Sequence, residues 1–309
     1  MNARASEWIV DNAAWKKARA RLSVLIPFKG DDPARLLAAL DLEGANAEIV
    51  LLDDGTNDGA LTERLTAQVE AMALPTRFVR LAANQGRAKG RNTLASHARA
   101  AHLLFLDSDM LPDSDAFLAT WLKIAQADTP VAFGGFSLKQ TPERREHALH
   151  RAMALKTDCT PAPERARQPE KHVFTSNLLV RRDVFQAIGF DEAFAGWGWE
   201  DVEWAMRVTR AHPILHADNP ATHLGLDTAR DIAGKYEQSV ANFGRVAQLH
   251  PDIVAAYPSH RVAKLLKHVP LRAVWRPLFK AIALTDAAPL PARALAMRLY
   301  RTALYADVV

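Results

Sequence analysis

The residues Leu103-Leu104-Phe105-Leu106-Asp107-Ser108-Asp109 form the most informative stretch of this chain. Four large apolar residues run together and then stop at two carboxylates one residue apart. A short, bounded apolar run predicts a buried strand of a parallel sheet. Ligands of open α/β sheets bind beyond the carboxyl ends of the strands, where these aspartates fall. The pair therefore indicates either a site for Mg²⁺ or Mn²⁺ or a strand that ends in an ordinary polar turn.

The chain before this stretch alternates between strand and helix patterns. Apolar or alternating runs at 23–27, 48–52 and 76–81 predict three further strands, and helical patterns separate them. Such alternation is typical of an α/β fold with a mostly parallel sheet flanked by helices, the arrangement of a Rossmann-like nucleotide-binding half.

Composition excludes several classes of protein. The chain has 309 residues, a formal charge of +4 and one cysteine, Cys159, which rules out an intrachain disulfide framework and a Cys-rich zinc site. The small charge gives no indication of nucleic-acid binding, and we expect no nucleic-acid partner. No apolar run is long enough to cross a membrane, and residues 1–20 lack the apolar core of a signal peptide. We expect a cytoplasmic protein whose residues 1–20 form an amphipathic helix.

Three acidic clusters fall at or near predicted strand ends. They are Asp53-Asp54, Asp107-Ser108-Asp109 and Glu200-Asp201. Placing several carboxylates close together costs electrostatic free energy unless they bind cations or transfer protons. The joint placement of the three clusters therefore favours a functional site over three unrelated turns.

In order and spacing, these motifs resemble the family-2 inverting glycosyltransferases, which have the GT-A fold and use nucleotide-sugar donors. The resemblance covers residues 21–225 and rests on Ser23–Pro27, Val50–Thr56, Asn84–Gly86, Gly90–Asn92 and Phe105–Asp109. A later segment, Gly196-Trp197-Gly198-Trp199-Glu200-Asp201-Val202-Glu203, resembles the acceptor motif of galactosyltransferase-like and chondroitin-polymerase-like members. Relatives usually have Gly-Gly before the Glu-Asp pair, and here the second glycine is Trp199.

The resemblance implies a site for the donor nucleotide. Asp54 would accept from the ring imide of uracil, which favours a UDP-sugar. Arg91 would pair with a carboxylate near the base or with the diphosphate, although Arg87 and Lys89 are equally available. The residues expected at the donor nucleotide are Pro27, Phe28, Asp53, Asp54, Arg91, Asp107 and Ser108.

The resemblance also implies a divalent cation, Mn²⁺ or Mg²⁺, that neutralises the leaving diphosphate. Asp109 would bind the cation directly, and Asp107 would bind the ribose, the cation or both. A histidine often completes the metal shell in relatives. We favour His223 over His216, because His223 lies in a loop-like setting beyond a strand.

For catalysis, the resemblance implies that Asp201 is the general base that takes the proton from an acceptor hydroxyl. Glu200 would hold an acceptor hydroxyl or order the loop; the alternative for both acids is capping of a helix N-terminus. Trp197 and Trp199 are candidate platforms for the acceptor sugar, with burial in the core as the alternative for each. Asn177 is the remaining candidate for contact with the acceptor.

From residue 226 the chain is helical and basic, so we expect a C-terminal helical extension over 226–309 after a GT-A domain over 21–225. Apolar residues are interleaved with basic ones between His260 and Tyr300. Such a pattern indicates either peripheral binding to an anionic membrane surface at its inner face or a helical cap on the catalytic domain.

Together, the motifs and the resemblance predict a metal-dependent inverting glycosyltransferase of polysaccharide biosynthesis that acts on a glycan or glycoconjugate acceptor. Two alternatives are a non-catalytic nucleotide-sugar-binding or membrane-targeting module and a metal-dependent phosphatase. The Asp-x-Asp motif of such phosphatases normally follows the first strand, whereas here it follows the fourth predicted strand.

Overall fold

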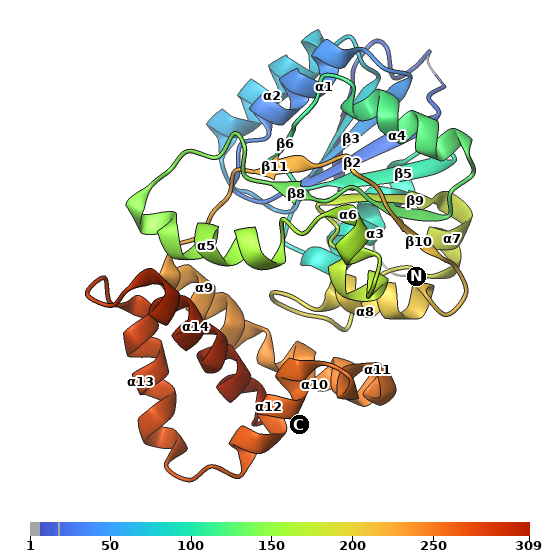
Figure 1. The fold of residues 1–309 in the computed structure, drawn as a ribbon. Coiled ribbons are helices and arrows are strands. Elements are labelled where there is room, and N and C mark those ends of the chain that lie inside the picture. The colour runs from blue at the N-terminus through green and yellow to red at the C-terminus, as the bar shows by residue number, and fades with distance from the viewer. Residues whose placement is uncertain (1–6, 18) are drawn as a thin grey trace.

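The computed structural model describes residues 7–17 and 19–309. Figure 1 shows a sheet flanked by helices and, below it, a group of helices formed by the end of the chain. The strands are β1 (Glu7–Asp11), β2 (Leu22–Phe28), β3 (Ala47–Asp53), β4 (Thr76–Leu81), β5 (His102–Leu106), β6 (Met110–Pro112), β7 (Val131–Phe133), β8 (Phe136–Ser137), β9 (Asn177–Arg181), β10 (Ile214–His216) and β11 (Ala221–His223).

The helices of the α/β part are α1 (Ala34–Glu43), α2 (Gly59–Ala71), α3 (Arg87–His97), α4 (Phe117–Gln126), α5 (Ala148–Thr157), α6 (Ala162–Arg165), α7 (Arg182–Ala187) and α8 (Glu200–Val208). Those of the extension are α9 (Ala229–Gln238), α10 (Val240–Leu249), α11 (Pro251–Ala255), α12 (Pro258–Lys267), α13 (Arg272–Leu284) and α14 (Leu290–Tyr305).

The large sheet has the strand order β1-β4-β3-β2-β5-β9-β7-β10. Strands β4, β3, β2 and β5 run parallel, as the alternating pattern predicts, while β9 runs antiparallel to both of its neighbours. A second sheet, β6-β11-β8, lies beyond the end of β5. The α/β class and the mostly parallel sheet are confirmed.

Alternate residues of the central strands enter two different cores. Ile26 and Ile49 pack with α1, α2 and α4 on one face, and Leu25 and Val50 pack with α3, α7 and α8 on the other. Because both faces are covered, the strands are nearly continuous apolar runs. The apolar part of the opening stretch, Leu103–Leu106, is therefore fully inside the protein.

The helix expected over residues 1–20 is wrong for the part that the structure describes. Residues Glu7–Asp11 form the edge strand β1, which pairs antiparallel with β4. Trp8, Ile9 and Val10 are aromatic or β-branched, which favours a strand, and the ring of Trp8 packs edge-on against Phe78. Residues 1–6 and 18 of that expectation lie outside the described residues.

The helices α9–α14 have a core of their own. Phe243, Met297, Tyr300 and Tyr305 belong to it, and it also takes in Met206 of α8. The extension is thus packed against the α/β part through α8, the helix that begins with the Glu200-Asp201 pair. Within residues 7–17 and 19–309, no helix combines the length and the apolar character needed to cross a bilayer.

An ion pair between buried Glu48 and partly exposed Arg99 joins the amino ends of β2 and β3 to the segment before β5. Glu48 is 0% exposed, and its carboxylate accepts from the Ser23 hydroxyl and from the main chain and guanidinium of Arg99. The Arg99 guanidinium also lies 3.6 Å over the ring of Trp15.

We predict that Glu48→Ala lowers the free energy of unfolding by about 3 kcal/mol, because it leaves the Arg99 guanidinium and the Ser23 hydroxyl without their acceptor. Urea unfolding followed by circular dichroism measures the change. The matched control is Glu63→Ala on the exposed side of α2, which should shift stability by less than about 0.5 kcal/mol. Equal effects of the two substitutions would contradict the assigned role.

Candidate active site

The predicted acidic turns meet at one edge of the large sheet. Phe28 at the end of β2 pairs with Asp53 at the end of β3, and Leu25 of β2 pairs with Phe105 of β5. Because these three strands are parallel, the loops after Phe28, Asp53 and Leu106 lie together, as expected for the carboxyl edge of an α/β sheet.

The turn after β3 uses its two aspartates differently. Asp53 is buried, accepts from the Thr56 main-chain N–H at 2.7 Å and pairs with Arg80, so its carboxylate is committed to the turn. Asp54 accepts from the main-chain N–H groups of Gln85 and Gly86 at 2.7 and 3.1 Å. Burial raises the pKa of Asp54 despite these bonds. Of the pair, Asp54 is the one whose oxygens face the loop before α3.

The two residues expected to line a base pocket are not equivalent. Phe28 is buried and packs against Phe78 with 6.1 Å between ring centroids, while Pro27 is half-buried. The Phe28 ring faces the core, so the predicted contact of Phe28 with the donor nucleotide would have to use its main chain. What Phe28 offers the loop is its carbonyl, which accepts from the Asp54 N–H at 2.9 Å.

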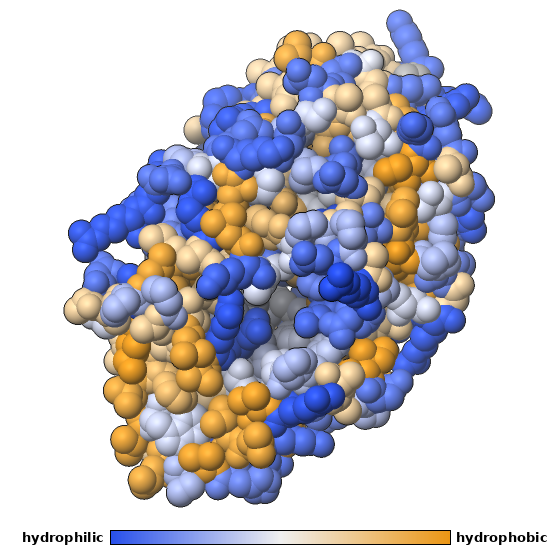
Figure 2. Space-filling model, in the orientation of Figure 1, coloured by the Kyte–Doolittle hydropathy of each residue, from blue (hydrophilic) through white to orange (hydrophobic). Residues whose placement is uncertain are grey.

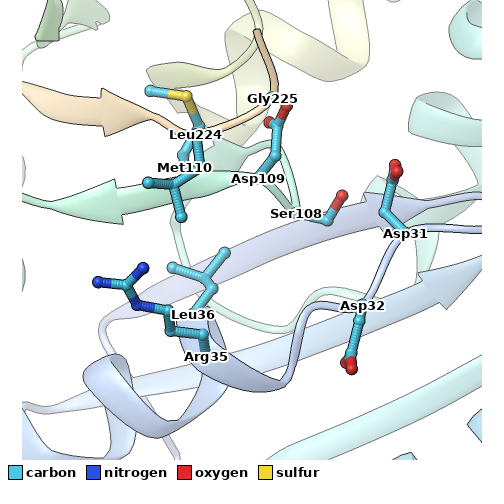
Figure 3. A pocket seen from close by; sticks show the side chains of 9 residues that line it. All are labelled: Asp31, Asp32, Arg35, Leu36, Ser108, Asp109, Met110, Leu224 and Gly225. Atoms are coloured by element: carbon cyan, nitrogen blue, oxygen red, sulfur yellow. The ribbon is translucent and has the colours of Figure 1, made fainter. Parts of the chain in front are cut away.

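A pocket of about 240 Å³ opens beside the end of β5. Its floor is Ser108, Asp109 and Met110, and Asp31 lies across from Ser108 (Figure 3). Burial raises the pKa of Asp31, and the nearby carboxylates of Asp109 and Asp107 raise it further. Acids thus outnumber bases in the lining of the pocket, where Arg35 is the one basic residue among those that the structure describes. The other lining residues are Asp32, Arg35, Leu36, Leu224 and Gly225.

Asp107 and Asp109 point to different partners. Asp107 binds the buried guanidinium of Arg91 at 2.6 Å. Asp109 Oδ2 lies 3.1 Å from Nε2 of His223, which is brought there by the pairing of β11 with β6. Burial alone would raise the pKa of Asp109 and lower that of His223, but their contact outweighs it and shifts both the other way.

The residues at Asp109 fit a cation that arrives with a diphosphate. Mg²⁺ and Mn²⁺ are usually held by one or two carboxylates while water and phosphate oxygens fill the remaining positions. Asp109 provides a carboxylate and His223 an imidazole nitrogen as possible ligands. Gly225 leaves the space beside them open, since a Cβ there would overlap the Asp109 carboxylate. Over residues 7–17 and 19–309, no three His, Cys, Asp or Glu side chains form a ready-made cage.

His216 lies in a different environment. Its Nδ1 accepts from the Arg165 Nε at 3.2 Å, and its Nε2 lies 3.2 Å from the Pro169 carbonyl. Burial and the Arg165 charge lower its pKa to about 4. Of the two histidines considered, only His223 contacts an acid of the Asp107–Asp109 motif.

Glu200 is held by two arginines of α3. Its buried carboxylate bonds Arg87 and lies 3.9 Å from Arg91, while its Oε2 has no hydrogen-bond partner in the described chain. Burial would raise the pKa of Glu200, but Arg87 and Arg91 outweigh it and lower it. The Arg87 side chain remains 38% exposed, so the ion pair reaches the protein surface on the Arg87 side. Figure 2 shows that the surface is hollowed between the α/β part and the helical extension.

Asp201 follows in the first turn of α8 and forms no ion pair with any residue that the structure describes. Its Oδ1 accepts from the Val202 N–H at 2.8 Å. Burial, and then the charge of Glu200, raise its pKa to about 7. When the surroundings raise the pKa of one carboxyl and lower that of its neighbour, the two groups usually have different roles in acid–base chemistry.

The two tryptophans of the loop before α8 differ in their contacts. Trp199 adopts φ +76°, its indole N–H donates to the Tyr305 hydroxyl at 3.0 Å, and its ring lies 4.9 Å from that of Phe243. Trp199 is therefore engaged with the extension, which is the packing alternative. Trp197 is half-buried, with Tyr236 at 6.2 Å and Lys235 5.9 Å over its ring.

Asn177 is not placed for contact with an acceptor, and this expectation is wrong. It is 0% exposed on β9, and its amide group donates to the carbonyls of Gly135 and Asn219 at 3.0 and 2.9 Å. The amide thereby joins the main chain at Gly135 to that at Asn219.

Residues 23–189 match the model of glycosyl transferase family 2, which is more than half of the chain. The chain belongs to glycosyl transferase family 2. The family-2 glycosyltransferase recognised from its motifs is thus confirmed, and the protein is a transferase. The match ends before Glu200, so the roles of residues beyond 189 depend on the geometry described above.

Solved structures show the same GT-A fold at low identity. A mannosyltransferase from Pyrobaculum calidifontis, in complex with GDP-Man and Mn²⁺, is 16% identical, with a TM-score of 0.54, over 95% of this chain and 88% of its own. TarS of S. aureus is also 16% identical, with a TM-score of 0.52, over 93% of this chain and 54% of its own. No curated protein sequence matches this glycosyltransferase in the corresponding comparison.

One residue of the site, Asp31, and one pairing, that of Arg87 with Glu200, were not predicted from the sequence. Asp31 reaches the Asp107–Asp109 motif from the loop after β2, and its position beyond a strand end was the available signal. Arg87 pairs with Glu200, more than a hundred residues away. The sequence shows that Arg87 lies one helical turn before Arg91, but it does not show that Arg87 meets Glu200.

We predict that Asp201→Asn stabilises the glycosyltransferase above neutral pH. A carboxyl with a raised pKa stabilises the fold while protonated; this contribution is complete below about pH 4 and is lost as the pH rises through about 7. The gain of the variant in free energy of unfolding should therefore be on the order of 2 kcal/mol at pH 8 and near zero at pH 4. Urea unfolding at the two pH values measures it.

Asp191→Asn is the control of opposite sign. Burial would raise the pKa of Asp191, but its pairing with Arg245 outweighs this and lowers it, so the stability that this carboxylate contributes is lost as the pH falls. The control should lose stability at pH 8. A pH-independent effect of Asp201→Asn, or a loss at pH 8, would contradict the assigned environment of Asp201.

Proposed function

We propose that this glycosyltransferase moves a sugar from a UDP-sugar to a hydroxyl of a glycan or glycoconjugate, with inversion at the anomeric carbon. The observation that carries the proposal is the Glu200–Asp201 pair, in which one acid is kept ionised by Arg87 and Arg91 while the other has a pKa near neutrality. Such a poised carboxyl is suited to accept a proton at physiological pH.

The nucleotide would bind over the loops at the carboxyl edge of β2, β3 and β5. Asp54 is the candidate for the base, because a carboxylate fixed by two main-chain N–H groups keeps free lone pairs for a ring imide. Pro27 lies beside it on β2. Arg91, Asp107 and Ser108 would contact the ribose and diphosphate; the Arg91–Asp107 pair fixes the orientation of both side chains.

A divalent cation, Mn²⁺ or Mg²⁺, would be held by Asp109 and His223 with Asp107 nearby. It would supply charge neutralisation for the diphosphate as this group leaves. The acids gathered around the pocket support a cation at this position, because the carboxylates of Asp109 and Asp107 still raise the pKa of Asp31. The mannosyltransferase of similar fold was solved with Mn²⁺ and GDP-Man.

In the transfer step, the Asp201 carboxylate would take the proton of the acceptor hydroxyl as that oxygen forms its bond to the anomeric carbon. The bond from this carbon to the diphosphate oxygen breaks on the opposite face, and the nucleoside diphosphate leaves with the electron pair. Glu200 remains ionised between Arg87 and Arg91 and orders the loop that carries the base. One base and one displacement invert the anomeric centre.

The acceptor would lie against Trp197, whose half-buried ring is available to the apolar face of a sugar. We further propose that the acceptor is a surface polysaccharide or its precursor and that the protein meets it as a peripheral protein at the inner face of the membrane. The basic extension supports this location. The family match supports neither a phosphatase nor a sensor without a base.

We predict that Asp201→Asn lowers kcat about 10²–10⁴-fold while the dissociation constant of the nucleotide is unchanged. In the parent enzyme, kcat/KM should fall about tenfold per unit as the pH drops below about 7, because protonated Asp201 cannot accept a proton. Transfer is measured by mass spectrometry with a panel of UDP- and GDP-sugars and an acceptor extract, and binding by calorimetry.

Asp191→Asn, which removes an acid of the same loop that pairs with Arg245, serves as the matched control and should retain transfer. Full transfer by Asp201→Asn would place the base elsewhere. No turnover or binding of any nucleotide sugar by the parent protein would overturn the proposed function.

A second prediction concerns the space beside Asp109. Gly225→Ala should weaken Mn²⁺-dependent donor binding at least tenfold, because the new methyl group must displace the Asp109 carboxylate from His223. Isothermal calorimetry with UDP and Mn²⁺ measures the change. Gly234→Ala on α9, where a Cβ meets nothing within 4 Å, is the matched control and should bind normally. Normal binding by Gly225→Ala would contradict the assignment of Asp109.

A further inference from the structure

The helices α12 and α13 and the turn between them, here called the α12–α13 hairpin, pack Leu266, Phe279 and Ile282 against the core of the extension but leave several other apolar side chains exposed. In the thirteen residues of α13, only Ala283 is buried, although the helix contains Val274, Trp275, Leu278 and Phe279. The most exposed large side chains of the hairpin are Leu271 at 73%, Leu265 at 69%, Val274 at 63% and Leu278 at 53%. In Figure 2, hydrophobic residues gather over this lower end of the extension.

The tip of the hairpin has a fixed and strained shape. Leu271 adopts φ +63°, a left-handed conformation that a leucine rarely takes, and its side chain points to solvent. The indole N–H of Trp275 donates to the Pro270 carbonyl at 2.8 Å, which fixes the turn in this shape. Strain of this kind at an exposed apolar tip is a sign of function, because folding alone gains nothing from it.

The positive charge of the hairpin indicates which kind of partner it binds. Residues 253–285 contain no Asp or Glu but six basic residues, Arg261, Lys264, Lys267, Arg272, Arg276 and Lys280. Arg272 and Arg276 pair with Asp307, whereas the exposed Arg261 and Lys264 form no ion pair with a described residue. A second copy of the chain would bring like charges together, while an anionic bilayer offers both negative headgroups and an apolar interior.

We propose that the α12–α13 hairpin is a membrane anchor that inserts Leu271 and its apolar neighbours into an anionic bilayer, with Arg261 and Lys264 at the headgroups. This inference specifies the proposed peripheral location and does not depend on the transfer reaction. The end of α14 links the hairpin to the active-site loop, since Tyr305 meets Trp199 and Asp307 pairs with Arg272.

The test is co-sedimentation of the full chain with vesicles of phosphatidylcholine alone or with about 30% phosphatidylglycerol, at low and high salt. We expect binding to the anionic vesicles only, weakened by salt. Leu271→Gly should weaken it about tenfold without lowering the unfolding temperature, because glycine relieves the left-handed strain while removing the inserted side chain. Lys264→Glu should also weaken it, by severalfold.

Leu42→Ala and Lys17→Glu, at exposed positions outside the extension, are the matched controls and should bind as the parent protein does. Equal binding to both vesicle types, no loss in Leu271→Gly, or a dimer in ultracentrifugation that Leu271→Gly dissociates would each overturn the anchor. Transfer to a freely dissolved acceptor, measured on the same variants, is expected to be unchanged. Loss of vesicle binding with retained transfer separates failure of the anchor from failure of the proposed function.

Discussion

The buried carboxylate of Glu200 is the contact on which the arrangement of the site depends. It bonds Arg87 and lies near Arg91, and Arg91 in turn binds Asp107. One ionic network thereby joins α8, α3 and the end of β5, which come from distant parts of the chain. Removing any member would leave a buried charge without its counterpart, so the network holds the three elements in one relative position. Its second effect is electrostatic, since an ionised Glu200 raises the pKa of Asp201 beside it.

The helical extension supports the same loop from the other side. Trp199, in a left-handed conformation, reaches Tyr305 of α14, and the Asn242 amide of α10 donates to the carbonyls of Ala195 and Gly198. The loop before Glu200 contains little regular structure, so its main-chain groups need such partners to be satisfied. The substitution of tryptophan for the second glycine of the related motif is therefore explained by a packing contact. It ties the loop to a part of the chain that the family match does not include.

The sequence was sufficient for the central sheet because its strands are covered on both faces, which makes each one a continuous apolar run. It was also sufficient to bring Asp54, Asp107 and Asp109 to one edge, since parallel strands place their carboxyl ends together. The sequence was not sufficient where the local structure depends on pairing with a distant segment of the chain. Glu7–Asp11 became a strand because β4 offered an open edge, and Asn177 became buried because β9 inserted antiparallel between β5 and β7. Residue type alone could not reveal that Arg87 and Glu200 meet.

Local strain in the described chain is concentrated where function is proposed. Besides Asp128, only Trp199 and Leu271 have positive φ among the described residues other than glycine. The first holds the loop that carries Asp201, and the second is the tip of the α12–α13 hairpin. Strain costs stability, and it persists only where surrounding contacts fix it, as Tyr305 does for Trp199 and the Trp275 bond does for the turn at Leu271. Because α14 packs against α13 and also contacts the loop, the extension is a single support between the proposed bilayer contact and the proposed catalytic base.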